Sequence, residues 1–189
     1  MFKFSLNFLF VLFIFSFVTS VTPQSKDAAI QISDEQIVDQ LTSRNWKNST
    51  EAVHEIIKRG ERMIPLLLKL KGRKEIFVGH GLGSPNSASF SAEFDVRKGL
   101  KKELIVTVEI TALYLISAVY YDNLSFAQNP FLTDLTVPRD KRTYNNGNEL
   151  VGKAWKTTEM WLEKYHEIGI EKLRLSKDHP LKGADVAFW

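Results

Sequence analysis

The spacing of apolar and polar residues predicts a mainly α-helical protein built around one stretch, residues 104–122. This stretch of 19 residues contains 14 apolar or aromatic residues and no glycine or proline. As a helix it would span about 28 Å, and a helix that is apolar nearly all round is either buried in a core or inserted in a membrane. Glu109 lies within it, and an acidic residue costs about 2.5–3.5 kcal/mol at the centre of a membrane helix. We therefore expect a buried central helix; the alternative is a membrane span in a membrane-anchored structural protein.

Residues 33–72 have apolar positions at spacings of three and four, which is typical of amphipathic helices. Ser33 and Gln36 have the spacing of a capping box at the start of the first helix. Ser49 or Thr50 is the expected N-cap of the second helix, because hydroxyl side chains accept hydrogen bonds from the first backbone N–H groups of a helix. A third helix is expected to follow and to end this region.

The helical pattern breaks over residues 73–103, where we expect a long loop or a small β-hairpin. Apolar residues alternate with polar ones over 88–94, which is the period of a strand. The β-branched residues within 105–110 would also allow a strand at the start of the central stretch. We expect the segment 73–103 to pack over the N-terminal helices.

The C-terminal part is expected to contain one long helix and a docked tail. Residues 123–147 are predicted to be mostly loop, because prolines and an Asn-Asn-Gly turn signal interrupt them. A wide apolar stripe predicts an amphipathic helix over 148–175, with Gly169 as a point of interruption. The two aromatic residues that end the tail, 176–189, are expected to dock on the body. Residues 33–189 would thus form a single, mainly α domain.

The segment from about residue 34 to residue 72 resembles a HEAT-type helical repeat. The resemblance rests on a short helix, a turn, a helix with paired apolar positions and an isoleucine–proline start of the next helix: Ala52-Val53, Ile56-Ile57, Gly60 and Ile64-Pro65. It implies an antiparallel helical pair that buries one face against its neighbours. Residues 104–165 are more weakly similar to exported bacterial proteins with HEAT-like N-terminal helices, a similarity that implies no catalytic or binding residue.

The first 20 residues have the pattern of a secretory signal peptide. Lys3 precedes a long run of phenylalanine, leucine and valine, and small residues follow it. We expect cleavage between Ser20 and Val21, followed by a flexible N-terminus over 21–32. The protein would then be periplasmic or secreted and would contact the membrane only through the signal peptide; an uncleaved anchor is the alternative.

Composition narrows the expected compartment and partners. The formal net charge of +3 is small and evenly spread, which argues against a nucleic-acid partner. The chain contains no cysteine, so an exported form must depend on its core rather than on disulfides. This combination fits a bacterial envelope better than an animal extracellular fluid.

Two Glu-x-x-His pairs raise the question of a metal site. Together with two further glutamates they supply the ligand types of a di-iron helical bundle: Glu51 with His54, Glu163 with His166, Glu35 and Glu109. Both pairs lie on helix faces opposite to the apolar stripes, whereas the ligands of such a bundle must point into its core. We therefore expect no metal and no other cofactor.

The glycine-rich segment 79–84 matches no standard catalytic or phosphate-binding motif. It lacks the Lys-Ser/Thr of a P-loop and the glycine spacing of a dinucleotide site. Several serines follow His80, but no Gly-x-Ser-x-Gly elbow accompanies them, and proximity in sequence does not define a catalytic triad. These patterns argue against nucleotide binding and against a serine hydrolase.

The sequence favours a non-enzymatic binding or scaffolding protein of the bacterial envelope, with a protein or peptide as partner. An inhibitor or immunity-type protein is the sharper form of this prediction. The argument is partly one of analogy, since helical-repeat surfaces usually bind other chains. The candidate binding residues are His80, Ser84 and Glu109, and no catalytic residue is assigned. The alternative is an envelope enzyme whose site combines His80 and Glu109 with residues distant in sequence.

Overall fold

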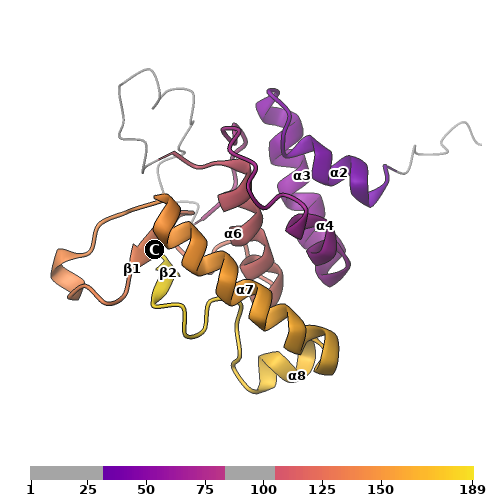
Figure 1. Cartoon of the computed structure of the whole chain (residues 1–189). Coiled ribbons are helices and arrows are strands. Elements are labelled where there is room, and N and C mark those ends of the chain that lie inside the picture. The colour runs from indigo at the N-terminus through magenta and orange to yellow at the C-terminus, as the bar shows by residue number, and fades with distance from the viewer. Residues whose placement is uncertain (1–31, 84–104) are drawn as a thin grey trace, which may run out of the picture. The chain divides into compact units, whose positions relative to one another are not determined.

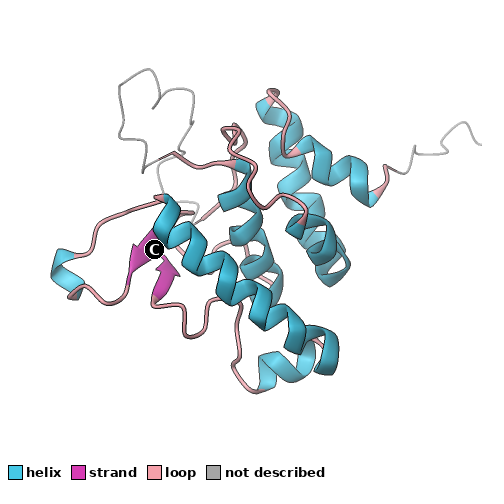
Figure 2. Ribbon diagram, viewed as in Figure 1, coloured by secondary structure: helices cyan, strands magenta, loops and turns pink. Residues whose placement is uncertain are grey.

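The computed structural model describes residues 32–83 and 105–189, which all fall within one compact unit, Ile32–Trp189. Helices predominate (Figure 1), and the same view shows a single pair of short strands in this part of the chain (Figure 2). The predicted mainly α class is therefore confirmed. Within these two ranges, no helix combines the length and the hydropathy that crossing a bilayer requires. The predicted signal peptide with its cut at Ser20 and Val21, Ser84 and the strand pattern over 88–94 lie outside the described residues.

The N-terminal part contains three α-helices with short connections. They are α2 (Asp34–Gln40), α3 (Trp46–Arg59) and α4 (Ile64–Leu68), and a 3-10 turn, η2 (Gly60–Met63), leads into α4. Helix α2 contacts both α3 and α4. The apolar positions at helical spacing are the buried ones, as the pattern predicted: Ile37, Val38, Ala52, Val53, Ile56, Ile64 and Leu67.

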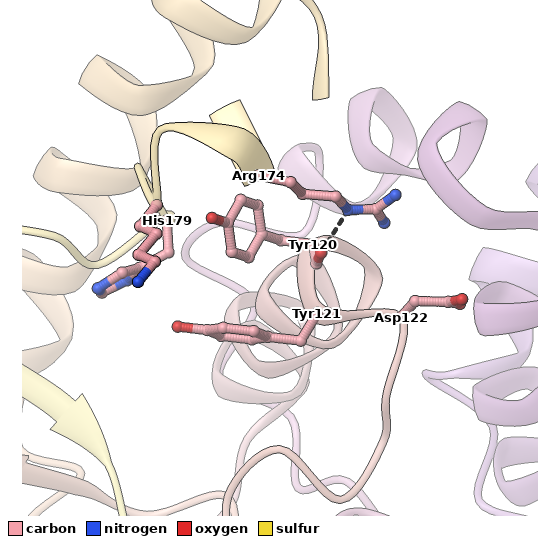
Figure 3. A pocket seen from close by; sticks show the side chains of 6 residues that line it. Tyr120, Tyr121, Asp122, Arg174 and His179 are labelled. Carbon is pink, nitrogen blue, oxygen red and sulfur yellow. Dashed lines mark hydrogen bonds between the residues drawn. The ribbon is translucent and has the colours of Figure 1, made fainter. Parts of the chain in front are cut away.

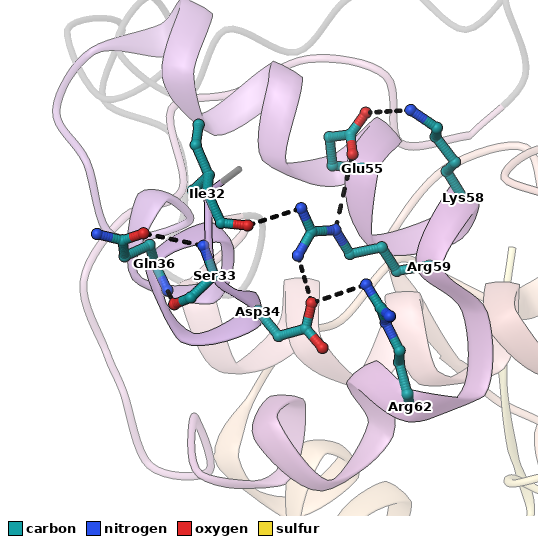
Figure 4. Close-up of polar contacts among 8 residues, drawn as sticks. All are labelled: Ile32, Ser33, Asp34, Gln36, Glu55, Lys58, Arg59 and Arg62. Atoms are coloured by element: carbon teal, nitrogen blue, oxygen red, sulfur yellow. Dashed lines mark hydrogen bonds and ion pairs between the residues drawn. The ribbon is translucent and has the colours of Figure 1, made fainter. Parts of the chain in front are cut away.

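A polar network closes the start of this part (Figure 4). The predicted capping box is present: the Gln36 N–H donates to the Ser33 hydroxyl at 3.2 Å, and the Ser33 N–H donates to the Gln36 side chain at 2.9 Å. Arg59 pairs with Asp34 and donates to the Ile32 carbonyl at 2.9 Å. These contacts join the start of α2 to the end of α3.

Helix α3 begins earlier than the sequence predicted. Asn45, and neither Ser49 nor Thr50, is the N-cap, because its side chain accepts from the Lys47 N–H at 3.0 Å. Ser49 is fully buried and donates its hydroxyl to the carbonyl of Gln40 at the end of α2 and to that of Ser43 in the following connection, each at 3.1 Å. A hydroxyl inside the first turn and an asparagine before it are both good local partners for the backbone, and here the asparagine takes the capping position.

The C-terminal helical part consists of two helices. They are α7 (Asn148–Ile168) and α8 (Ile170–Leu175), and Gly169 separates them. The interruption predicted at Gly169 is confirmed: its φ of 78° lies in a region that side chains other than glycine's rarely adopt. The buried side chains of α7 form the predicted stripe: Leu150, Val151, Ala154, Trp155, Thr158 and Trp161.

Helix α6 (Val108–Tyr121) is the buried centre of the described part. Every residue from Val108 to Tyr120 is buried, and the helix contacts α3, α4, α7 and α8. It lies between the N-terminal helices and α7 (Figure 1). It begins four residues later than the stretch 104–122 suggested, because Thr107 caps it and forms an antiparallel bridge with Ile76. Thr107 forms an isolated bridge, but the residues from Val108 on are helical, so the strand alternative for residues 105–110 is wrong.

A two-stranded antiparallel sheet ties the end of the chain to the segment after α6. Strand β1 (Leu132–Asp134) pairs with β2 (Val186–Phe188), with Leu132 opposite Phe188. The Trp189 N–H also donates to the Phe131 carbonyl at 2.9 Å. The expected docking of the tail is thus confirmed, whereas the strand within the predicted loop 123–147 is a feature that the sequence analysis missed.

Candidate functional site

The structure gives two of the predicted binding residues, His80 and Glu109, different surroundings. The His80 N–H donates to the Thr50 hydroxyl at 2.8 Å, and its ring packs edge-on against Trp46 with ring centroids 5.4 Å apart. Glu109 is 3% exposed, pairs with Lys74 and accepts from the Gly72 N–H at 2.7 Å. No hydrogen bond or ion pair joins His80 to Glu109 in the described ranges. Ser84, the third candidate, lies outside them.

Glu109 has a structural explanation. It stands in the first turn of α6, where the positive end of the helix dipole favours a carboxylate. Its pairing with Lys74 and the Gly72 N–H also ties the helix start to the segment that follows α4. Pairing with a lysine was one of the roles that the sequence left open for this residue.

The two Glu-x-x-His pairs face solvent. Glu51 and His54 on α3, and Glu163 and His166 on α7, are all exposed. Within the residues that the structure describes, no three histidine, aspartate or glutamate side chains are grouped closely enough to hold a metal ion.

A hollow of about 540 Å³ lies at the C-terminal end of α6. Three rings, two cations and one carboxylate line it: Tyr120, Tyr121, His179, Arg174, Lys177 and Asp122. Figure 3 shows the hydroxyl ends of Tyr120 and Tyr121 directed towards the His179 side, whereas Asp122 and the Arg174 guanidinium are directed away from it. We call this the polar hollow.

A second hollow of about 440 Å³ adjoins the first. Apolar side chains are the more numerous in its lining, which includes Phe126, Leu181 and Phe188 together with the polar residues Ser117 and Asn123. Tyr121 and His179 line both hollows, and their ring centroids lie 6.1 Å apart. We call this the apolar hollow. The two hollows together form one candidate site with the Tyr121–His179 pair as their common wall.

The end of α6 is held in place by the segments that complete the site. Arg174 of α8 donates from Nε to the Tyr120 carbonyl at 2.7 Å and from Nη2 to the Val119 carbonyl at 2.8 Å. It therefore satisfies carbonyl groups that a helix end leaves without partners. Trp161 of α7 donates to the Asp178 carbonyl at 2.8 Å. The residues after α8, including His179, are thus fixed against α6.

Both helices that meet at the polar hollow end in a left-handed residue that is not glycine. Asp122 follows α6 with a φ of 50°, and Lys177 follows the last turn of α8 with a φ of 53°. The Lys177 N–H donates to the Arg174 carbonyl and the Asp178 N–H to the Leu173 carbonyl, which is the Schellman arrangement. Glycine is the usual residue at this position, and lysine there costs about 1–2 kcal/mol. A strained residue at a hollow is a recognised sign of function.

Burial favours the uncharged forms of the ring groups of the site. Desolvation raises the pKa of Tyr121 and, with a further contribution from Asp178, that of Tyr120. Desolvation, together with the nearby Lys182, lowers the pKa of His179, against the opposing effect of Asp178. Both phenols therefore keep their hydrogen, and the neutral imidazole offers one N–H donor and one acceptor.

Ser117 contributes an unpartnered hydroxyl to the apolar hollow. The residue is 2% exposed, and its Oγ has no hydrogen-bond partner among the described residues. Ser117 and Tyr121 are four residues apart in α6, so they lie one above the other on the same helix face. A buried hydroxyl without a partner costs about 1–3 kcal/mol, and such groups in a native protein call for an explanation.

Comparisons with protein-family models, with curated proteins and with solved structures return no match to this chain. The resemblance to HEAT repeats therefore stays a prediction.

Sequence reasoning missed the residues that build this site. Tyr121 stands at the visible end of the apolar stretch, but Lys177 and His179 come more than fifty residues later in a segment without a motif. The one local signal was the Tyr-Tyr-Asp end of the central helix, where polar aromatic residues replace aliphatic ones. The partners of that end depend on the fold, so no spacing rule could have supplied them.

Proposed function

We propose that this chain is an exported, non-enzymatic binding protein of the bacterial envelope, and that it holds its partner at the paired hollows beside Tyr121 and His179. A protein or peptide is the proposed partner, as the sequence favoured. The observation that carries the proposal is the shared wall: two adjoining hollows, one lined by charged and aromatic side chains and one mainly by apolar side chains, meet at the rings of Tyr121 and His179.

The chemistry of the lining is that of recognition. Aromatic rings give large contact areas at low entropic cost, and a few polar groups fix orientation. The two phenols and the imidazole are uncharged donors, while Lys177 is a cation without an ion pair in the described part of the chain. Tyr121 is 44% exposed and is therefore available to a partner.

Partner capture with a site variant tests the proposal. The tagged protein and its Tyr121→Ala variant are exposed to envelope extract of the source bacterium at matched salt, and retained proteins are identified by mass spectrometry. We expect one stoichiometric partner with the wild type and at least a tenfold loss with Tyr121→Ala, because Tyr121 lines both hollows.

A matched control separates this site from the surface that the sequence suggested. Trp46 is an exposed aromatic residue, 57% accessible, and it packs on His80. We expect Trp46→Ala to keep the partner. Loss with Trp46→Ala and retention with Tyr121→Ala would refute binding at the hollows and place it near His80.

Export is tested separately. A tagged full chain is expressed in a bacterial host, which is then fractionated. The proposal expects the protein in the periplasm or medium with Val21 as its first residue, since small residues precede that bond. Recovery of the intact chain from the cytosol alone would contradict it.

A further inference from the structure

The geometry points to the ligand of the paired hollows: the C-terminal residue of a peptide, with its free carboxylate in the polar hollow and an apolar side chain in the apolar hollow. This inference rests on the proposed binding function and names the part of the partner that is recognised.

The charge of the polar hollow favours a carboxylate. Lys177 lines the hollow and Lys182 lies near His179, and neither forms an ion pair within the described residues, whereas Asp178 is paired with Lys164 at 2.8 Å. Asp122, the one carboxylate of the lining, is directed away from His179 (Figure 3). An incoming carboxylate would therefore meet an unpaired ammonium group and the Tyr121 hydroxyl, which form charge-assisted hydrogen bonds.

The apolar hollow fits one side chain. Phe126, Leu181 and Phe188 are among its walls, and its volume of about 440 Å³ falls in the range of about 300–1,000 Å³ that is usual for ligand sites. Both hollows open to solvent. A chain end can therefore enter while the rest of the peptide leaves, which an enclosed cavity for a small molecule would not allow.

Ser117 supplies the third contact. Its Oγ has no partner among the described residues, and Ser117 stands four residues, about 6 Å, before Tyr121 along α6. Successive peptide units are about 3.3–3.6 Å apart, so an amide group next to the terminal residue can reach Ser117 while the carboxylate lies beyond Tyr121. A carboxylate, an amide and an apolar side chain within one residue are the defining features of a peptide C-terminus, and carboxylate capture is a known mode of peptide recognition.

Two lining residues destabilise the free protein, and a bound ligand would offset that destabilisation. Lys177 holds a left-handed conformation, and Ser117 buries a hydroxyl without a partner. Proteins keep such departures from local rules mainly at functional sites. We therefore expect Lys177→Gly and Ser117→Ala each to raise Tm and yet to weaken binding, a combination that a purely structural role does not produce.

The test uses a fluorescein-labelled pentapeptide that ends in phenylalanine, as the free acid and as the amide. Fluorescence anisotropy with the purified protein is expected to show at least tenfold tighter binding of the acid. Lys177→Gly is expected to abolish this preference, and Ser117→Ala to weaken both peptides about fivefold. Lys156→Gln on α7, which removes the same charge from an exposed position away from the site, is expected to leave both affinities unchanged.

The outcomes separate this inference from the proposed function. Equal affinity for acid and amide, or an acid preference that survives Lys177→Gly, would overturn carboxylate recognition. If neither peptide binds while an envelope partner is captured in a Tyr121-dependent manner, the ligand class is wrong and the binding function stands. If neither peptide binds and capture does not depend on Tyr121, both fail.

Discussion

Buried hydroxyl groups in this molecule differ in whether they have a hydrogen-bond partner, and therefore in whether they stabilise the fold. Ser49 is fully buried and its hydroxyl donates to backbone carbonyls at 3.1 Å. Thr158 on α7 is 1% exposed, and its hydroxyl has no partner among the described residues. The same type of group is thus favourable at one position and costly at the other, because a buried hydroxyl gains only when it is hydrogen-bonded.

Thr158→Val tests this difference. Valine has nearly the same shape and removes an unsatisfied hydroxyl, so we expect the free energy of unfolding to rise by about 1 kcal/mol. Ser49→Ala is the matched control and is expected to lower it by about 1 kcal/mol. Urea unfolding measures the free energy of unfolding of both variants. Destabilisation by Thr158→Val would mean that the Thr158 hydroxyl has a hydrogen-bond partner after all.

Glu109 should behave as a stability residue. Its carboxylate is almost fully buried and accepts a backbone N–H at 2.7 Å besides pairing with Lys74. We expect Glu109→Ala to cost about 2–3 kcal/mol, since hydrogen bonds to charged groups are the strong ones. Glu159→Ala, which breaks an exposed ion pair with Lys71 at 2.5 Å, should cost less than about 1 kcal/mol. Similar losses in thermal unfolding would contradict the structural role.

His179 makes stability depend on pH. Desolvation and Lys182 lower its pKa in the folded state, against Asp178. Between the folded and unfolded pKa values the unfolded chain binds the additional proton, so the contribution is present above about pH 6.5 and is lost as the pH falls below it. We expect Tm to fall from pH 7 to pH 5 and to fall less in His179→Gln. His166→Gln, at an exposed position, should keep the wild-type slope.

At the scale of elements, α6 was the most predictable part and its surroundings the least. An apolar stretch interrupted by one glutamate was enough to predict a buried helix. A helix that is apolar nearly all round has no polar face to turn towards water, so it must be buried. The helix begins later than predicted because the bridge from Thr107 to Ile76 competes with helix formation. The sheet and the site were not predictable, since β1 and β2 are three residues each and pair across about fifty residues of chain.

Tyr114 links α6 to the wall of the apolar hollow. Its hydroxyl donates to the Leu124 carbonyl at 2.6 Å, and its ring lies 4.7 Å from that of Phe126. We expect Tyr114→Phe to cost about 1–2 kcal/mol and to raise amide exchange in the segment 124–127. Tyr144→Phe, at a residue 38% exposed, is expected to change neither quantity. Unaltered exchange in Tyr114→Phe would show that the segment is held by ring packing alone.

At the scale of the described unit, one core includes residues from both ends of its chain. Buried positions run from Ile37 to Phe188. The ring of Phe188 lies 5.1 Å from that of Tyr114 and 6.0 Å from that of Phe126. The second-last residue of the chain is therefore part of the packing around α6, and the apolar hollow depends on it.

Phe188→Ala should test how much the tail contributes. Removal of a buried phenylalanine typically costs about 3–5 kcal/mol, and here it would also open the apolar hollow. We expect a cost near the lower end, since Phe188 is 9% exposed. Leu135→Ala, next to β1 and 41% exposed, should cost under about 1 kcal/mol. Chemical denaturation measures the free energy of unfolding of both variants. If Phe188→Ala cost no more than Leu135→Ala, the packing of β2 would contribute little to stability.

The pairing of β2 with β1 also has a consequence for biosynthesis. Strand β2 is made about fifty residues after β1, and until residues 186–188 emerge from the ribosome β1 has no strand partner and Tyr114 has no contact with Phe188. Contacts of this sequence separation form late. Helix α6, whose residues Val108 to Tyr120 are all buried in the folded protein, therefore stays incompletely covered until β2 has been made. Products truncated before β2 would stay in that state, where exposed apolar surface promotes aggregation, so the core is fully covered only in chains that contain β2.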